Sequence, residues 1–156
     1  MKYFTSELWA GMQDSCIQDE TERRWDKNAE LYASYFSSIR ERLPKGFLKI
    51  FDRECGFHDF TIEKINLSFV TRKTMPNAVC VTILITNGEN RYQIIIKNVD
   101  ISNINIIDKS YCIRGRLSWG YTEFELLENK KIELRILCDI YNELTFVFDK
   151  ISIKKL

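Results

Sequence analysis

Histidine and proline are scarce in this sequence, and the scarcity of histidine limits the metal sites that the chain could form. Of the 156 residues, 1 is histidine and 2 are proline. With His58 as the sole imidazole, a metal centre built on several histidines is excluded. The 5 cysteines are widely separated and form no Cys-x-x-Cys pair, which argues against a disulfide framework and a zinc ribbon. We therefore expect no bound metal, no cofactor and a reducing, cytoplasmic compartment.

Charge and hydropathy argue against two classes of partner. The formal net charge is +1, so bulk electrostatics favours neither nucleic acid nor an anionic membrane. No apolar run is long enough for a signal peptide at the start or for a bilayer-spanning helix elsewhere. We expect neither nucleic acid nor a membrane as the partner.

The common catalytic motifs are also missing. The chain contains no HExxH, no GxSxG, no phosphate loop and no dinucleotide-binding sequence. What is present is a hydrophobic content of 45% and a charged content of 29%. In a chain of this length, that balance predicts one globular domain spanning residues 1–156.

Residues 1–56 carry helical patterns. Thr5 or Ser6 can cap a short helix within "TSELWAGMQ". Over residues 19–43, apolar side chains recur at helical spacing and form one stripe, until Pro44 ends this helix and begins the next, "PKGFLKIFDREC". The stripe consists of Trp25, Tyr32, Phe36, Ile39 and Leu43.

Residues 57–156 change to a period of two, which is the period of β-strands. The stretch "AVCVTILIT" is apolar on both faces and predicts a central strand. Slips of parity at Glu63–Lys64 and Asp149–Lys150 indicate irregular points, and the first predicts a bulge. The gaps between strands are too short for crossover helices, so we expect an antiparallel meander of about six strands. The fold class is α+β, with the N-terminal helices packed on one face of the sheet.

His58 lies in "KIFDRECGFHDFTIEKI", between the last helix and the first strand. Gly56 falls just past a helix, where a left-handed cap needs glycine, and Phe57 can make the hydrophobic contact of such a cap. The favoured interpretation is therefore structural: His58 and Asp59 join helix to strand, and their side chains hydrogen-bond the free backbone groups there.

Functional interpretations of the same stretch stay open. Cys55 and His58 are a candidate nucleophile and base, but the negative end of a helix dipole raises a thiol's pKa. A metal site could use His58, Asp59 and Cys55, but a structural zinc would need a fourth ligand from far away. His58 and Asp59 remain candidates for partner binding or acid–base chemistry.

A second candidate surface lies in "IRGRLSWGYTEFE". Arginine, tryptophan and tyrosine are enriched at interaction hot spots, although ordinary strand alternation with polar residues facing solvent also explains the stretch. Its candidate binding residues are Arg114, Arg116, Trp119, Tyr121 and Glu123.

The opening "MKYFTSELW", the tryptophan-bearing charged helix, "RLPKGFLKIF" and "FHDFTIEKI" together resemble a group of small bacterial proteins known only as a domain of unknown function. The resemblance covers roughly the first 70 residues, and it implies no activity and no functional residue. In size and style the chain is also similar to immunity proteins of bacterial toxin systems.

Two functions follow as expectations. The leading one is a non-enzymatic cytoplasmic protein that binds another macromolecule, in its most specific form a toxin-neutralising immunity-type protein with a protein partner. The alternative is a small-ligand binder or enzyme with a pocket between helices and sheet that uses His58 and Asp59. An enzyme requires several polar groups in one concavity, whereas a binding protein presents a broad exposed patch.

Overall fold

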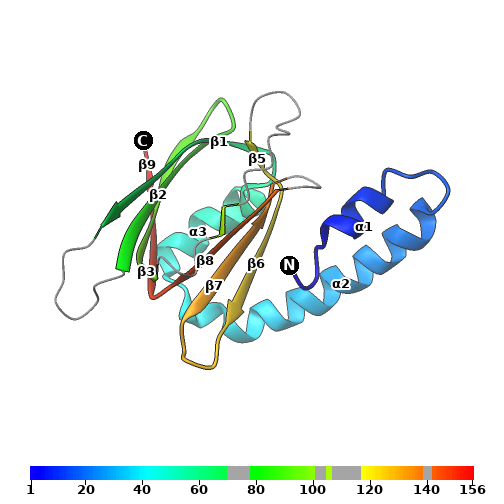
Figure 1. The fold of residues 1–156 in the computed structure, drawn as a ribbon, viewed down its shortest axis with the longest axis horizontal. Coiled ribbons are helices and arrows are strands. Elements are labelled where there is room, and N and C mark those ends of the chain that lie inside the picture. The colour runs from blue at the N-terminus through cyan, green and yellow to red at the C-terminus, as the bar shows by residue number, and fades with distance from the viewer. Residues whose placement is uncertain (70–77, 101–104, 107–116, 139–141) are drawn as a thin grey trace.

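The computed structural model describes residues 1–69, 78–100, 105–106, 117–138 and 142–156. Helices come first and strands follow, as predicted for an α+β protein (Figure 1). The predicted site residues Arg114 and Arg116, and most of the predicted strand 111–119, lie outside the described residues. None of the described helices is long and apolar enough to cross a membrane.

The helical part contains three α-helices. Helix α1 spans Ser6–Gly11 and is capped by Thr5, whose hydroxyl accepts a hydrogen bond from the Leu8 amide at 3.3 Å. Helix α2 spans Gln18–Ile39 and continues as one 3-10 turn, Arg40–Arg42, and helix α3 spans Lys45–Arg53. The predicted long helix thus ends earlier than residue 43, because Pro44 forces the residue before it into an extended conformation.

The apolar stripe of α2 faces the sheet at strand β6 (Tyr121–Leu126), as predicted. Trp25 and Ile39 are buried, and Tyr32 and Phe36 are half-buried. The ring of Phe36 stacks on Phe124 of β6 with centroids 5.7 Å apart. The helical period of the sequence therefore fixed the correct face of this helix.

The strands form two sheets. The five-stranded sheet has the order β5-β1-β2-β3-β9 and the four-stranded sheet the order β4-β8-β7-β6. All described pairings are antiparallel, but the meander order holds only within β1–β2–β3 and β6–β7–β8. The strands are β1 (Phe60–Phe69), β2 (Ala78–Thr86), β3 (Arg91–Asp100), β4 (Asn105–Ile106), β5 (Leu117–Trp119), β6 (Tyr121–Leu126), β7 (Ile132–Leu137), β8 (Glu143–Phe148) and β9 (Lys150–Lys155).

Both predicted irregularities are present, with different consequences. The register of β1 shifts between Ile62 and Lys64, which is the predicted bulge. At Asp149 the chain leaves β8 in one sheet and enters β9 in the other. The parity slip at Asp149–Lys150 therefore marks a change of sheet rather than a bulge within one strand.

One aromatic-rich core joins the two sheets. Helix α3 lies between them (Figure 1), and its Phe47 is 2% exposed. Phe47 packs edge-on against Phe124 of β6 at 6.0 Å, and Phe57, at the helix-to-strand junction, packs against Trp119 of β5 at 5.4 Å. Central strand β2 contributes Val79, Val81, Ile83 and Ile85, all fully buried.

Candidate functional site

The helix-to-strand junction has the predicted left-handed glycine. Gly56 has φ = 70°, and Cys55, Phe57 and Asp59 also have positive φ values of 48°, 66° and 66°. Three non-glycine residues within five positions thus adopt left-handed backbone angles, which strains this segment. The strain is offset because Phe57 is fully buried and the Asp59 amide donates to the Trp119 carbonyl at 2.8 Å.

The side chains of His58 and Asp59 bind each other rather than the backbone. His58 Nδ1 lies 3.0 Å from Asp59 Oδ2, and the imidazole packs edge-on against Tyr121 at 4.9 Å. The expected bonds from these side chains to free backbone groups are not made within the described part of the chain. Burial, and the nearby carboxylate of Asp59, raise the pKa of Tyr121.

This corner does not converge into a reaction site. The Asp59 side chain is 86% exposed, and Cys55 is exposed as well. Three surface cavities formed by described residues are lined by neither His58 nor Asp59. Among the described residues, no group of three or more His, Cys, Asp or Glu side chains could hold a metal ion. The alternative function that relied on His58 and Asp59 thus gains little from their geometry.

Of the predicted binding residues, Trp119 lies in the interior and Tyr121 is half-buried. Trp119 is 1% exposed, and its indole N–H donates to the Thr122 hydroxyl at 2.7 Å. Tyr121 is half-buried, with its ring 4.5 Å from that of Trp25 and 5.4 Å from that of Trp9. The prediction that Trp119 belongs to an exposed surface is corrected, because β5 turns this ring toward the core.

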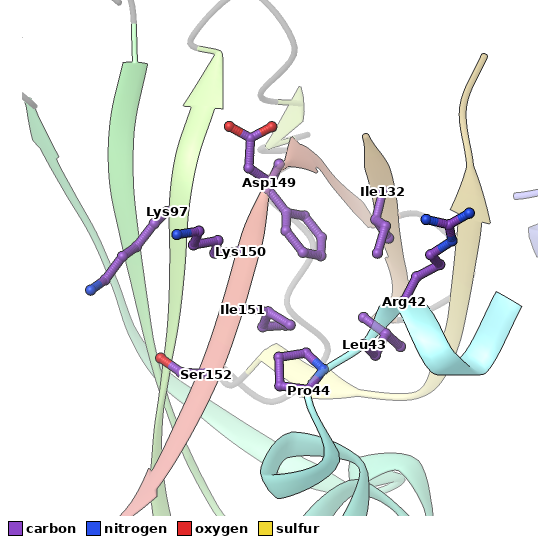
Figure 2. A pocket seen from close by; sticks show the side chains of 10 residues that line it. Arg42, Leu43, Pro44, Lys97, Ile132, Asp149, Lys150, Ile151 and Ser152 are labelled. Carbon is purple, nitrogen blue, oxygen red and sulfur yellow. The ribbon is translucent and has the colours of Figure 1, made fainter. Parts of the chain in front are cut away.

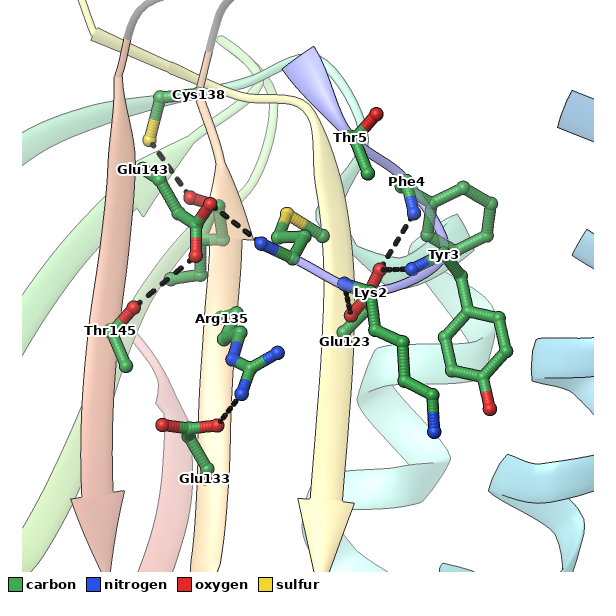
Figure 3. Close-up of polar contacts among 12 residues, drawn as sticks. Lys2, Tyr3, Phe4, Thr5, Glu123, Glu133, Arg135, Cys138, Glu143 and Thr145 are labelled. Atoms are coloured by element: carbon green, nitrogen blue, oxygen red, sulfur yellow. Dashed lines mark hydrogen bonds and ion pairs between the residues drawn. The ribbon is translucent and has the colours of Figure 1, made fainter. Parts of the chain in front are cut away.

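Glu123 is also buried, at 3% exposure, and its carboxylate holds the N-terminal segment (Figure 3). Glu123 Oε2 accepts a hydrogen bond from the Lys2 amide at 2.8 Å. Its Oε1 accepts two more, from the Tyr3 and Phe4 amides, both at 2.7 Å. Three donors satisfy a carboxylate that burial would otherwise destabilise. Glu123 is therefore an anchor within the fold and is not available to a partner.

The neighbouring charges on this outer face of the four-stranded sheet are paired too (Figure 3). Arg135 forms ion pairs with Glu133 and, at 3.1 Å, with Glu125. Glu143 binds the terminal ammonium group of Met1 at 2.9 Å. This face is rich in carboxylates, yet these three glutamates, like Glu123, already have partners inside the molecule.

A polar network joins α3 to β3. The Tyr92 hydroxyl donates to Glu54 at 2.7 Å and accepts a hydrogen bond from Arg53 at 2.8 Å. The hydrogen bond from Tyr92, with a further contribution from Arg53, lowers the pKa of Glu54. Burial raises the pKa of Tyr92. With all its members bonded to each other, this network fixes α3 on the sheet rather than presenting a reactive group.

The outer face of the five-stranded sheet is different, because four of its lysines form no ion pair with any described residue. The strand register places Lys64, Leu84, Gln93 and Lys154 in one row across β1, β2, β3 and β9. A second row runs Asn66, Thr82, Ile95 and Ser152, and a further pair is Lys97 and Lys150.

This arrangement defines a lysine-rimmed face: Leu84 and Ile95 at the centre, with Lys64, Lys97, Lys150 and Lys154 around them. The central pair is half-buried and the four lysines are exposed. None of these lysines forms an ion pair within the part of the chain described. Figure 2 shows Lys97, Lys150 and Ser152 directed to this side of β9, away from Ile151.

Strand alternation in the sequence carries a signal for this face. The alternation that buries Ile94 and Ile96 in β3 puts Lys97 on the opposite side, and the same holds for Lys150 and Ile151 in β9. The sequence did not show that β3 and β9 pair with each other, because they are about fifty residues apart in the chain. The net charge of +1 conceals a separation of basic and acidic side chains onto different sheets.

Comparison with known proteins gives no match: no family model, no curated protein and no solved structure matches this chain. The resemblance of the first 70 residues or so to a bacterial domain family remains a prediction.

Proposed function

We propose that this protein is a non-enzymatic binding protein whose partner is a protein with an acidic surface, and that the lysine-rimmed face is its docking surface. The observation that carries the proposal is the set of four exposed, unpaired lysines around a half-buried apolar pair. An apolar centre with a charged, solvated rim is the usual anatomy of a protein–protein interface. Opposite charge on the partner would steer association and select against basic partners.

A protein partner fits this face better than a nucleic acid does. Sheet surfaces that bind single-stranded nucleic acids present aromatic rings on which bases stack. Here the central positions are Leu84 and Ile95, whereas Tyr92 and Trp119 point into the core. The arginine on the same strand face, Arg91, is already paired with Glu63 at 2.7 Å.

The more specific form of the proposal is a cytoplasmic, toxin-neutralising role. Its support is the similarity in size and α+β build to immunity proteins, together with the lysine-rimmed docking surface. A partner that stops growth when expressed alone, and not when co-expressed with this protein, would establish that role.

The test of the proposed function is capture of proteins from the native host by two charge-reversed variants. The first variant, Lys64→Glu/Lys97→Glu, changes the lysine-rimmed face. The matched control, Lys27→Glu/Lys49→Glu, changes the net charge by the same amount at exposed positions of α2 and α3. We expect one partner, itself acidic at its contact surface, to be retained by the parent and the control and lost by the first variant. Equal retention by both variants, or capture that nuclease treatment abolishes, would refute the proposal.

A further inference from the structure

Among the described strands, β9 pairs with β3 alone and forms one edge of the five-stranded sheet. The Leu156 amide donates to the Arg91 carbonyl at 2.9 Å, which identifies that pair as hydrogen-bonded. Because bonded pairs alternate in an antiparallel ladder, Ser152 and Lys154 also turn their backbone groups toward β3. The backbone N–H and C=O groups of Ile151, Ile153 and Lys155 therefore point away from β3, and no described residue hydrogen-bonds them. Ile151 is only 3% exposed, whereas Ile153 is half-buried and Lys155 is exposed, so the accessible part of this edge lies at Ile153 and Lys155.

The opposite edge of the fold is treated differently. Strand β6 is the last strand of the four-stranded sheet. Its outward amides at Phe124 and Leu126 donate to the hydroxyls of Tyr32 and Tyr35 of α2, at 2.7 and 2.9 Å. The edge at β6 is thus closed by side chains, whereas β9 has outward backbone groups at Ile153 and Lys155 that are available for pairing.

A groove runs beside the open edge. It has a volume of about 410 Å³ and lies between β9 and the turn from α2 to α3. Figure 2 shows Ile151 directed into the same space as Leu43, Pro44 and Ile132. An extended strand laid along β9 would direct alternate side chains to this side of the sheet, and the side chain next to Ile151 would reach the groove.

The other side chains of such a strand would lie on the lysine-rimmed face. They would neighbour Lys150, Ser152 and Lys154, which β9 presents on that side. Arg42 stands at the far wall of the groove, and one carboxylate, Asp149, lies at its end. Arg42 and Lys150 have no ion-pair partner in the described part of the chain. The local charge therefore favours a strand in which acidic residues alternate with apolar ones.

We propose that the partner contributes such a strand, an extended segment with alternating apolar and acidic residues that pairs with the free edge of β9. This inference rests on the proposed function, because it assumes the acidic partner and names the element through which that partner binds. Lysines on edge strands commonly prevent aggregation. On β9 they would also select the partner, because a second copy of β9 would place lysine next to lysine, whereas an acidic strand would be attracted.

A seven-residue peptide with alternating glutamate and valine and blocked ends is the probe. Titrated into the full chain labelled with ¹⁵N, it should shift the amide signals of Ile151, Ile153 and Lys155. A peptide with lysines in place of the glutamates should not bind. A peptide N-methylated at every second residue, at the amides that would donate to β9, should bind about tenfold more weakly or worse. Absence of shifts at β9, or equal binding by peptides methylated in either phase, would overturn the inference.

The matching changes in the protein are Ile153→Pro and Ile153→Ala. Proline removes the outward N–H, which β3 does not use, whereas alanine removes the side chain and keeps the N–H. We expect Ile153→Pro to bind the probe about tenfold more weakly than Ile153→Ala. If Ile153→Pro does not fold, the comparison of the two N-methylated peptides with the unaltered chain decides the question.

The two proposals fail separately once the host partner has been captured. Loss of the partner in Lys64→Glu/Lys97→Glu but full retention in Ile153→Pro would overturn the strand inference and leave the docking face intact. Retention in both variants would overturn the proposed function.

Discussion

Replacing the buried carboxylate of Glu123 by an amide should loosen the N-terminal segment from the sheet. In Glu123→Gln one oxygen can still accept the Tyr3 and Phe4 amides, but the new NH₂ group faces the Lys2 amide, donor against donor. Leaving that N–H unsatisfied costs about 1–3 kcal/mol, and turning two charge-assisted bonds into neutral ones costs about 1 kcal/mol each. The expected loss of local stability is about 3–5 kcal/mol.

The loss of global stability should be smaller than this local cost if the segment detaches as a unit. Phe4 and Leu8 are 8% and 6% exposed and anchor the segment against Trp25 of α2. Burying two such side chains contributes about 1.5–3 kcal/mol each, which sets the scale of the docking free energy. Once the substitution costs more than docking provides, residues 1–12 separate and the remaining fold persists.

Amide hydrogen exchange distinguishes this behaviour from global destabilisation. We expect the Lys2, Tyr3 and Phe4 amides to lose protection in Glu123→Gln, while the amides of β2 and β3 stay protected. Urea denaturation should show a lower free energy of unfolding. The matched control is Glu125→Gln on the same face of β6, whose partly exposed ion pair with Arg135 contributes about 0–1 kcal/mol. Unchanged protection of the three amides in Glu123→Gln would refute the account of this carboxylate as an anchor.

Three further outcomes follow from the described contacts. Tyr35→Phe removes the hydroxyl that accepts a β6 amide and should lower the free energy of unfolding by about 1–3 kcal/mol, measured in urea; no change would mean that water replaces it. Gly120→Ala would put a Cβ 2.5 Å from a β7 carbonyl oxygen and should cost about 3 kcal/mol, whereas Gly46→Ala, with no neighbour within 4 Å, serves as the tolerant control. The pKa of Glu54 in the folded protein lies below its usual value of 4.5, so the ionised carboxylate stabilises the fold above pH 4.5 and this stabilisation is lost as the pH falls through the folded pKa. Glu54→Gln should therefore make the free energy of unfolding depend less on pH on the acid side. An unchanged pH dependence would contradict the role given to Glu54.

Local patterns in the sequence were sufficient for the secondary structure and its caps. The helical spacing of Trp25 and Ile39 identified the buried face of α2, since a period of 3.6 residues places such positions on one side. The left-handed conformation at Gly56 followed from its place after an apolar helix. Each of these features depends on residues only a few positions apart in the chain, so local backbone geometry is sufficient to determine it.

The candidate sites depended on contacts that no local pattern contains. Glu123 follows the same alternation as an ordinary solvent-facing residue, and it is buried only because an N-terminal segment about 120 residues away supplies three amides. The lysine-rimmed face likewise exists only because β9 returns to pair with β3, next to β1 and β2. Strand alternation sets which side of a strand a residue occupies, whereas burial and partnership depend on which other strands and segments lie there, and packing of the whole chain decides that.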